Sequence, residues 1–247
     1  MKNKFLKLKN NTRKDIVENS KFYKSLCTFL IVFIIIFGGI IMNCIVPSES
    51  MSPTLEAGQV YIANRLAYIK SSPQRYDIVV FKAPDSERDK YVKRIIGLPG
   101  ELVNIDNQNV NIDNKKIDEP YLKEKKIDDC GIYYVPKKGD EVILQNAKYD
   151  EKGNLINADC YIGDNFVGTV GKVIDDEASD DENVKYKKID FLKKYCKKED
   201  GKYIIIEDTY FLMGDNRNNS LDSRFWNYTY VKKSKIIAKY AFTYLKF

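Results

Sequence analysis

The sequence contains no histidine among its 247 residues. This absence excludes a Ser-His-Asp triad, a Cys-His pair and any zinc site with imidazole ligands. A general base that works near neutral pH must then be a carboxylate, a lysine or a cysteine whose pKa is shifted toward 7. The choice of catalytic base is therefore limited to these three side chains.

The chain also lacks net charge beyond its first 24 residues. Residues 1–24 hold eight of the 41 basic residues and two of the 35 acidic ones, which accounts for the whole formal charge of +6. The remaining 33 basic and 33 acidic residues cancel. A charge-balanced body gives no electrostatic support to nucleic-acid binding, and we expect no nucleic-acid partner.

Residues 25–48 contain no charged side chain. The run supplies the roughly 20 apolar residues that cross a bilayer. It is long for a buried core helix, and a cleavable secretory signal would have a shorter apolar stretch of about 7–15 residues before a small-residue cleavage site. We therefore predict a retained transmembrane anchor over 25–46. The positive-inside rule then keeps the basic tail, 1–24, in the cytoplasm and the rest of this single-pass chain outside the plasma membrane.

Beyond the anchor the sequence has a strand pattern and no comparable helical periodicity. Residues 103–105 and 110–112 alternate around 106–109 like a hairpin. Other short segments are rich in β-branched and aromatic residues and bounded by turn residues: 59–64, 77–82, 91–96, 202–206 and 234–244. We predict a mainly β fold, in which one N-terminal transmembrane helix precedes an extracytoplasmic antiparallel β domain formed by 47–112 and 202–247.

Residues 113–201 differ in composition, being rich in Lys, Asp and Asn. We interpret this stretch as a variable, β-rich insert that forms a second, smaller domain. Its acidic run at 175–182 and the Lys-rich sequence that follows through Lys198 are expected to be solvated loop. The insert contains Cys130, Cys160 and Cys196, an odd number that allows at most one intramolecular disulfide. None has a partner histidine, so we do not expect a catalytic cysteine.

Three segments carry residues suited to chemistry. They are Pro47-Ser-Glu-Ser-Met-Ser-Pro-Thr-Leu55, Tyr91-Val-Lys-Arg-Ile-Ile-Gly-Leu-Pro-Gly-Glu101 and Gly214-Asp-Asn-Arg-Asn-Asn-Ser-Leu-Asp-Ser-Arg224. A serine hydroxyl needs a base to become a nucleophile, and with histidine absent a neutral lysine is the natural candidate. Lys93 lies within a predicted strand, on the same face as Tyr91 and Ile95. Burial there would lower its pKa from about 10.4 toward 7 or 8, at a cost of about 4 kcal/mol.

These segments, together with Tyr76-Asp-Ile-Val-Val-Phe-Lys82 and the anchor before them, resemble the type I signal peptidases of bacteria. Members of that family are membrane-bound serine endopeptidases with a Ser/Lys dyad. The resemblance implies removal of N-terminal signal peptides from exported preproteins after small residues of the Ala-x-Ala type. It also implies that the main β domain is catalytic.

The resemblance assigns roles to individual residues. Ser50 matches the nucleophile and Lys93 the general base. Ser48 matches the side chain that completes an oxyanion hole with the Ser50 N–H, because two donors can stabilise the developing charge. Ser220 matches the hydroxyl that orients the lysine amine, whereas Ser52 occupies a variable position.

Two ion pairs are implied in the same way, Asp215 with Arg94 and Asp222 with Arg224. The two carboxylates could by themselves suggest an aspartic protease, but the arginines around them favour a charge-paired scaffold. The chain departs from the family at Asn218, where many members have a second acidic residue.

The substrate would bind in shallow pockets and add as a strand to an exposed sheet edge. The resemblance implies that these pockets are lined by apolar or aromatic residues, namely Val46, Pro47, Met51, Leu55, Tyr91 and Val92. The expected partners are secretory preproteins and the lipid bilayer. We expect a functional monomer without a metal or other cofactor.

Other classes of protein remain possible at this point. A non-catalytic membrane-anchored surface or assembly protein would explain the anchor and the β domain, but not why Ser50, Lys93 and Ser220 occur together. A self-cleaving repressor-type protease would share the Ser/Lys dyad but would have a DNA-binding module in place of the anchor. A sortase-like transpeptidase is excluded because it needs a histidine beside its cysteine.

Overall fold

The structure is a computed structural model. It describes residues 2–86, 88–107, 109–122, 124, 127, 130–174 and 186–245. The chain divides into two compact units, residues 1–42 and 43–247, and each is described by itself. The acidic run predicted to be solvated, 175–182, lies outside the described residues.

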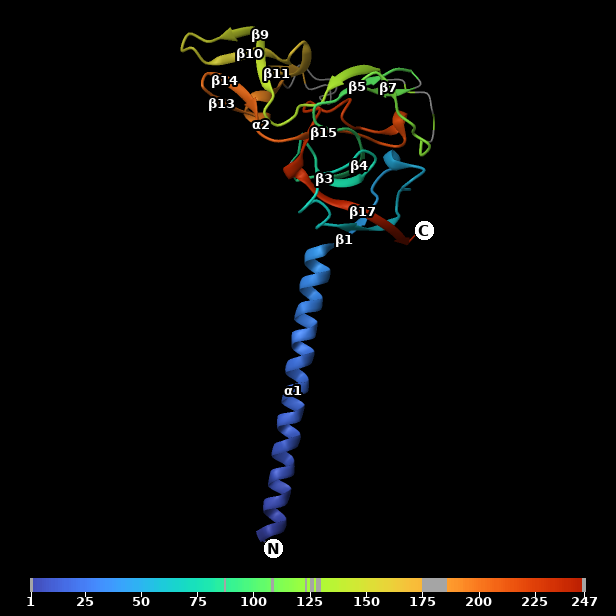
Figure 1. Ribbon diagram of the computed structural model, residues 1–247, viewed down its shortest axis with the longest axis vertical. Coiled ribbons are helices and arrows are strands. Elements are labelled where there is room, and N and C mark those ends of the chain that lie inside the picture. The colour runs from blue at the N-terminus through green and yellow to red at the C-terminus, as the bar shows by residue number, and fades with distance from the viewer. Residues whose placement is uncertain are drawn as a thin grey trace. The chain divides into compact units, whose positions relative to one another are not determined.

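The first unit is built on one long helix, α1 (Lys2–Ile40) (Figure 1). Its apolar part, 19–40, is 22 residues long with a mean hydropathy of 2.1, which suits a membrane span by length and composition. The helix is followed by strand β1 (Ile41–Ile45), so the last residues of the predicted 25–46 segment are not helical. Gly38 and Gly39 weaken the end of the helix, because each glycine costs about 1 kcal/mol relative to alanine in a helix interior.

Among the described residues, the strands of the chain form three sheets. The main sheet has seven strands in the order β1-β2-β17-β3-β4-β15-β16. Besides β1, its members are β2 (Val60–Asn64), β3 (Ile78–Lys82), β4 (Lys90–Gly97), β15 (Thr209–Met213), β16 (Val231–Lys232) and β17 (Ile236–Leu245). Neighbours β2–β17, β17–β3, β3–β4, β4–β15 and β15–β16 pair antiparallel, as predicted. The strands predicted over 59–64, 77–82, 91–96 and 234–244 are thereby confirmed.

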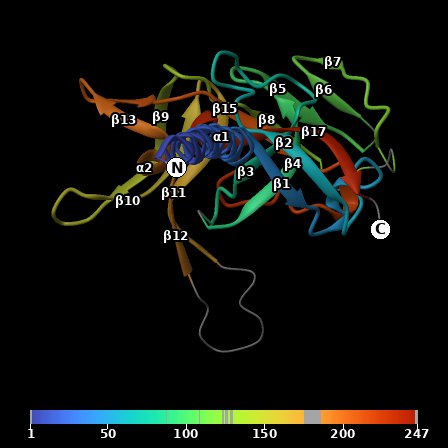
Figure 2. The same cartoon turned by 90° about the horizontal axis from the view of Figure 1, so that it is seen from below.

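A second sheet contains the predicted hairpin. Its strands β5 (Leu102–Ile105), β6 (Val110–Ile112), β7 (Lys115–Lys116) and β8 (Gly131–Tyr134) have the order β7-β6-β5-β8. Strands β5 and β6 pair antiparallel, and the Asn109 N–H donates to the Asp106 carboxylate at 2.7 Å to close the turn. Figure 2 shows β5, β6 and β7 close together on one side of the domain.

A third sheet of six strands, in the order β12-β11-β10-β9-β14-β13, is formed mainly by the insert. Its strands are β9 (Glu141–Tyr149), β10 (Leu155–Ile162), β11 (Asn165–Ile174), β12 (Tyr186–Asp190), β13 (Cys196–Glu199) and β14 (Lys202–Ile205). The strand predicted over 202–206 is therefore present as β14, and it pairs with β9 and β13 rather than with the main sheet.

From Tyr186 onward, the Lys-rich stretch of the insert, expected to be solvated loop through Lys198, is structured instead. Between β12 and β13 it forms the short helix α2 (Phe191–Tyr195). The apolar side chains of Phe191, Leu192 and Tyr195 are buried, and the Asp190 carboxylate caps the helix by accepting from the Lys193 N–H at 2.9 Å. The lysines of this stretch are interspersed with apolar residues that pack inward, which a count of charges does not reveal.

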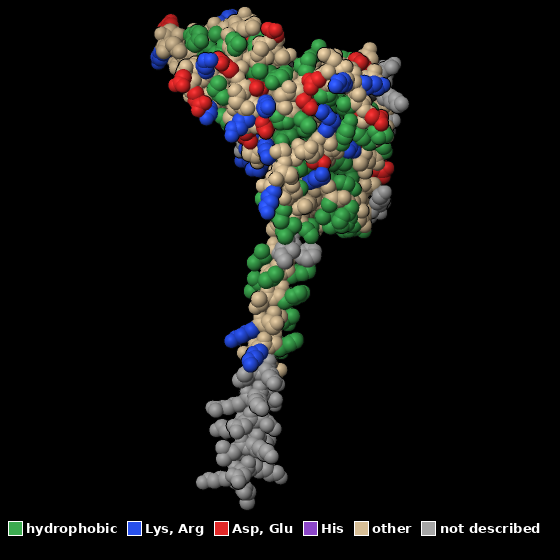
Figure 3. Space-filling model, viewed as in Figure 1, with side chains coloured by type: hydrophobic (Ala, Val, Ile, Leu, Met, Phe, Trp, Pro, Cys, Tyr) green, Lys and Arg blue, Asp and Glu red, His purple; other side chains and the backbone are tan. Residues whose placement is uncertain are grey.

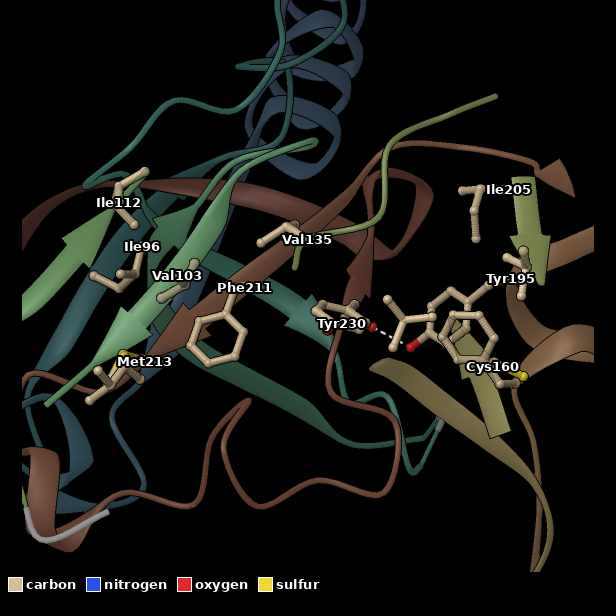
Figure 4. Close-up of a cluster of buried hydrophobic side chains, with 14 of the residues drawn as sticks. Ile96, Val103, Ile112, Val135, Cys160, Tyr195, Ile205, Phe211, Met213 and Tyr230 are labelled. Atoms are coloured by element: carbon tan, nitrogen blue, oxygen red, sulfur yellow. Dashed lines mark hydrogen bonds between the residues drawn. The ribbon is translucent and has the colours of Figure 1, made fainter. Parts of the chain in front are cut away.

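Strand β15 is buried on both faces, and its residues alternate between two hydrophobic clusters. Tyr210 and Leu212 pack in one cluster with β3 and β4, while Phe211 and Met213 point into the other. This second cluster continues to the insert through Tyr195, whose hydroxyl donates to the Tyr230 carbonyl at 2.5 Å (Figure 4). The main sheet and the insert therefore share one core.

The three cysteines of the insert are free thiols. Burial raises the pKa of Cys160 and of Cys196 to about 12, so neither is a thiolate near neutral pH. The visible surface of the β domain carries Lys, Arg, Asp and Glu interspersed (Figure 3), in keeping with the balanced charge of residues 25–247.

Candidate active site

Ser50 lies in a single turn of 3₁₀ helix, η1 (Glu49–Met51), and is almost fully buried. The turn is held by hydrogen bonds at its backbone. The Ser52 N–H donates to the Glu49 carbonyl at 3.0 Å, and the Asn216 N–H donates to the Ser50 carbonyl at 3.1 Å. The second bond connects the first of the three predicted segments to the third, so the position of Ser50 depends on residues far away in sequence.

Lys93 lies in the middle of β4, with Val79 of β3 as its cross-strand partner. Its amine donates to the Ser50 hydroxyl oxygen at 2.5 Å, and only 5% of the residue is exposed. Burial lowers the pKa of Lys93 to about 8, although the nearby Asp222 and Asp215 oppose this shift. Strand β4 both positions Lys93 and shields it from water. The amine of Lys93 therefore becomes neutral at a lower pH than the amine of an exposed lysine.

Ser48 directly precedes the same turn and remains exposed. Its hydroxyl donates to the Ser50 oxygen at 3.2 Å. The Ser50 oxygen thus accepts hydrogen bonds from both the Ser48 hydroxyl and the Lys93 amine.

Ser220, which was predicted to orient the lysine amine, also borders this site. Its hydroxyl is buried and has no hydrogen-bond partner among the described residues. The structure therefore does not contain a Ser220–Lys93 hydrogen bond, and the orienting role stays a prediction.

Both expected ion pairs are formed, and the carboxylates of both are fully buried. Arg94 donates to the two carboxylate oxygens of Asp215 at 2.8 and 2.6 Å. Arg224 donates to the two oxygens of Asp222 at 2.9 Å each. Each carboxylate is therefore paired with its own guanidinium, an arrangement that differs from the carboxylate pair of an aspartic protease.

A cavity of about 620 Å³ opens beside Ser50 and Lys93. Of the apolar residues expected to line it, Pro47, Tyr91 and Val92 do so. The other three, Val46, Met51 and Leu55, are buried and do not line it. Sequence reasoning missed four other residues that line the cavity, namely Asn218, Asn219, Leu221 and Phe225. Their only sequence signal is that they lie in or next to the third segment.

The comparison with known families is consistent with this geometry. The family described as "Signal peptidase, peptidase S26" matches residues 19–245. The chain belongs to this family. The match includes the apolar helix, both segments that form the Ser50–Lys93 contact, and the insert.

Individual signal peptidases show how far the similarity extends. Signal peptidase I of Buchnera aphidicola subsp. Acyrthosiphon pisum (strain APS) is 31% identical over 256 residues, covering 93% of this chain and 78% of that protein. Signal peptidase I of Aquifex aeolicus is 32% identical, covering 87% of this chain and 78% of its own. Signal peptidase I of Bacillus caldolyticus reaches 44% identity over a shorter stretch of 84 residues, 34% of this chain and 45% of that protein.

Membership of this family identifies the activity as that of a type I signal peptidase, a membrane-associated serine protease. It supports this activity over the alternative of a non-catalytic surface protein. Within the described part of the chain, no group of three or more His, Cys, Asp or Glu side chains is arranged to hold a metal ion.

Proposed function

We propose that Ser50 is the nucleophile of this signal peptidase and that Lys93 is its general base. The observation that carries the proposal is the 2.5 Å contact between the Lys93 amine and the Ser50 hydroxyl, at the edge of a cavity large enough for a peptide segment. The lowered pKa of the buried lysine supports it, because a base must be neutral to accept a proton.

The reaction follows from this arrangement. Neutral Lys93 takes the Ser50 proton as the oxygen attacks the scissile carbonyl, and it then passes this proton to the leaving amine. The Ser48 hydroxyl and the Ser50 N–H stabilise the oxyanion of the tetrahedral intermediate. In the second half of the reaction Lys93 takes a proton from a water molecule, whose oxygen attacks the acyl carbonyl. Lys93 then returns this proton to the Ser50 oxygen as the bond between the acyl group and Ser50 breaks. Ser220 orients the lysine amine during these steps.

The substrate is a preprotein that carries a signal peptide, cut after small residues in an Ala-x-Ala pattern. Among the described residues, β15 pairs with β4 only from Arg94 onward, so the backbone of 91–93 has an edge that β15 does not cover. An extended peptide that adds to this edge would pass the cavity lined by Pro47, Tyr91 and Val92.

The proposed topology keeps the basic tail, 1–24, in the cytoplasm and the β domain outside the membrane. The anchor then holds Ser50 near the membrane surface, where a translocated precursor presents its cleavage site. We also propose that the chain works as a monomer in the bilayer. In the proposed domain layout, 47–112 and 202–247 form the catalytic domain and 113–201 a second domain attached to it. The sheets cross these bounds, because β14 joins the sheet of the insert, and β7 and β8 join the sheet of β5 and β6.

The direct test is to incubate the purified full chain in detergent with a secretory precursor that has an Ala-x-Ala site. Appearance of the mature fragment is followed by gel and mass spectrometry. We expect cleavage by the wild type, and none by Ser50→Ala or Lys93→Ala, because each removes one member of the dyad.

Two matched controls make the test specific. Ser52→Ala removes another serine of the same segment, and Lys90→Ala removes an exposed lysine from the same strand. Both should cleave at nearly the wild-type rate. Near-normal turnover by Lys93→Ala would refute the role of the lysine, and loss of activity in Ser52→Ala with retention in Ser50→Ala would refute the nucleophile.

A further inference from the structure

Two residues outside the three predicted segments, Glu119 and Tyr121, contact the arginines that surround the dyad. They lie between β7 and β8, in a part of the chain to which the sequence assigned no function. We propose that Glu119 and Tyr121 are positioning residues that act through Arg217 and Arg94 to hold Ser50 in reach of Lys93. This inference rests on the proposed function of the dyad.

Glu119 pairs with the most deeply buried arginine of the site. The side chain of Arg217 has no exposed surface, and that of Glu119 is 6% exposed. Arg217 donates through both terminal nitrogens to the two carboxylate oxygens of Glu119, one of these bonds being 3.2 Å long. A buried guanidinium without a carboxylate partner is strongly unfavourable, so the location of Arg217 depends on Glu119.

Tyr121 connects this pair to the second arginine. Its hydroxyl donates to Glu119 at 2.8 Å, and its ring lies under the guanidinium of Arg94, 3.8 Å from the ring centroid. Arg94 is the partner of Asp215. Residues 119–121 therefore contact both arginines and restrict the orientation of the two guanidinium groups.

The two arginines hold the segment 214–217, which contacts the backbone of Ser50. Arg217 donates from Nε to the Gly214 carbonyl at 3.1 Å, and Arg94 binds Asp215, the next residue. Asn216, which directly follows Asp215, donates its N–H to the Ser50 carbonyl at 3.1 Å and its side-chain amide to the Glu49 carbonyl at 3.2 Å. A shift of the segment 214–217 would therefore move η1 and the Ser50 hydroxyl away from Lys93.

Proton transfer from Ser50 is far more sensitive to such a shift than substrate binding is. A misplacement of about 1 Å can cost on the order of a hundredfold in rate. Neither Glu119 nor Tyr121 lines the cavity beside the dyad. Their loss should consequently lower kcat and leave KM almost unchanged.

The experiment measures kcat and KM for precursor cleavage by the full chain in detergent, with the wild type, Glu119→Gln, Tyr121→Phe and Tyr121→Leu. We expect Glu119→Gln and Tyr121→Leu to lower kcat about 10- to 100-fold, with KM within threefold of wild type. Tyr121→Phe keeps the ring under Arg94 and should lose less activity than Tyr121→Leu. Glu124→Gln is the matched control, since among the described residues this exposed carboxylate of the same segment reaches Asn218 alone, at 3.5 Å, and neither arginine, and it should leave kcat unchanged.

A double variant tests whether Glu119 acts through Arg217. Replacing both partners, in Glu119→Gln with Arg217→Met, should lower kcat no further than Arg217→Met alone, because the two residues act as one unit. Additive losses would overturn the proposal, as would an unchanged kcat in both Glu119→Gln and Tyr121→Leu while Ser50→Ala is inactive. A rise in KM at constant kcat would overturn it too, because the residues would then act on substrate binding. A wild-type chain that cleaves no precursor would refute the proposed function, and this inference with it.

Discussion

Gly214 lies against the backbone of Ser50 so closely that a Cβ at this position would be 2.4 Å from the Ser50 carbonyl oxygen. The same Cβ would lie 2.3 Å from the Ser220 hydroxyl oxygen. Only glycine leaves room for the two segments to meet here. The contact allows Asn216 to hold the Ser50 carbonyl and keeps the Ser50 hydroxyl next to Lys93.

Replacing Gly214 with alanine should therefore inactivate the enzyme. The new methyl group must push apart η1 and the turn that starts at Gly214, and the Ser50 hydroxyl would move away from the lysine. We expect kcat to fall by about a hundredfold or more, with a lower melting temperature. Gly163→Ala, at a glycine with positive φ and open space around it, is the control for backbone strain alone and should cleave normally. Normal cleavage by Gly214→Ala would contradict the tight fit.

The activity should depend on pH through the amine of Lys93. Burial lowers the pKa of Lys93 to about 8, and only the neutral form can accept the Ser50 proton. We expect kcat/KM to rise about tenfold per pH unit below 8 and to level off above it. Measurement of initial rates from pH 5 to 10 checks this. A profile that is flat between pH 6 and 9 would be incompatible with a lysine base.

The stability of the fold should depend on the same group. An unfolded lysine titrates near 10.4, whereas Lys93 in the fold titrates near 8, so between these values the unfolded chain binds a proton that the folded chain does not. The wild type should lose about 3 kcal/mol of stability as pH falls from about 10.4 to 8, and no more below that.

A Lys93→Met variant has no amine at this position and should not lose stability between these pH values. We expect its free energy of unfolding to exceed that of the wild type by an amount that grows as pH falls through this window and then stays constant. Urea titrations at pH 7 and pH 10 measure the difference. An equal gap at the two pH values would show that Lys93 is not desolvated in the fold.

Ser220 offers a separate test, because its buried hydroxyl lacks a protein partner among the described residues. Ser220→Ala removes no hydrogen bond between described residues and should keep or raise the melting temperature. If the hydroxyl orients Lys93 during the reaction, kcat should nevertheless fall about tenfold or more. Unchanged kcat would remove Ser220 from the mechanism.

The proposed topology can be checked with cysteine labelling. Cys130 is exposed on the β domain, so a membrane-impermeant maleimide should label it in intact cells. A cysteine introduced in the basic tail, Asn3→Cys, should react only after the membrane is permeabilised, with Cys130 replaced by serine to avoid overlap. Labelling of Asn3→Cys in intact cells would reverse the proposed orientation.

Much of the fold could be read from the sequence, because its signals are local. The uncharged run that begins at residue 25 predicted an apolar helix, since membrane length is a property of about 20 consecutive residues. Alternation and β-branched residues predicted β2, β3, β4 and the β5–β6 hairpin. The short helix α2 was missed, because its lysines conceal an inward face that is only three residues wide.

The sequence by itself limited the chemistry that is available: without histidine, the base must be a carboxylate, a lysine or a cysteine, and Lys93 stood out because it lies inside a predicted strand. Only the tertiary structure decided what surrounds that lysine. It brings Glu119 to Arg217 across 98 positions, a pair that the sequence did not indicate, whereas the Arg94–Asp215 pair across 121 positions confirms an expectation. It also turns Met51 and Leu55 into the core rather than toward the cavity. Contacts of this kind depend on how three sheets pack around a shared core, and no local pattern of residues encodes such distances.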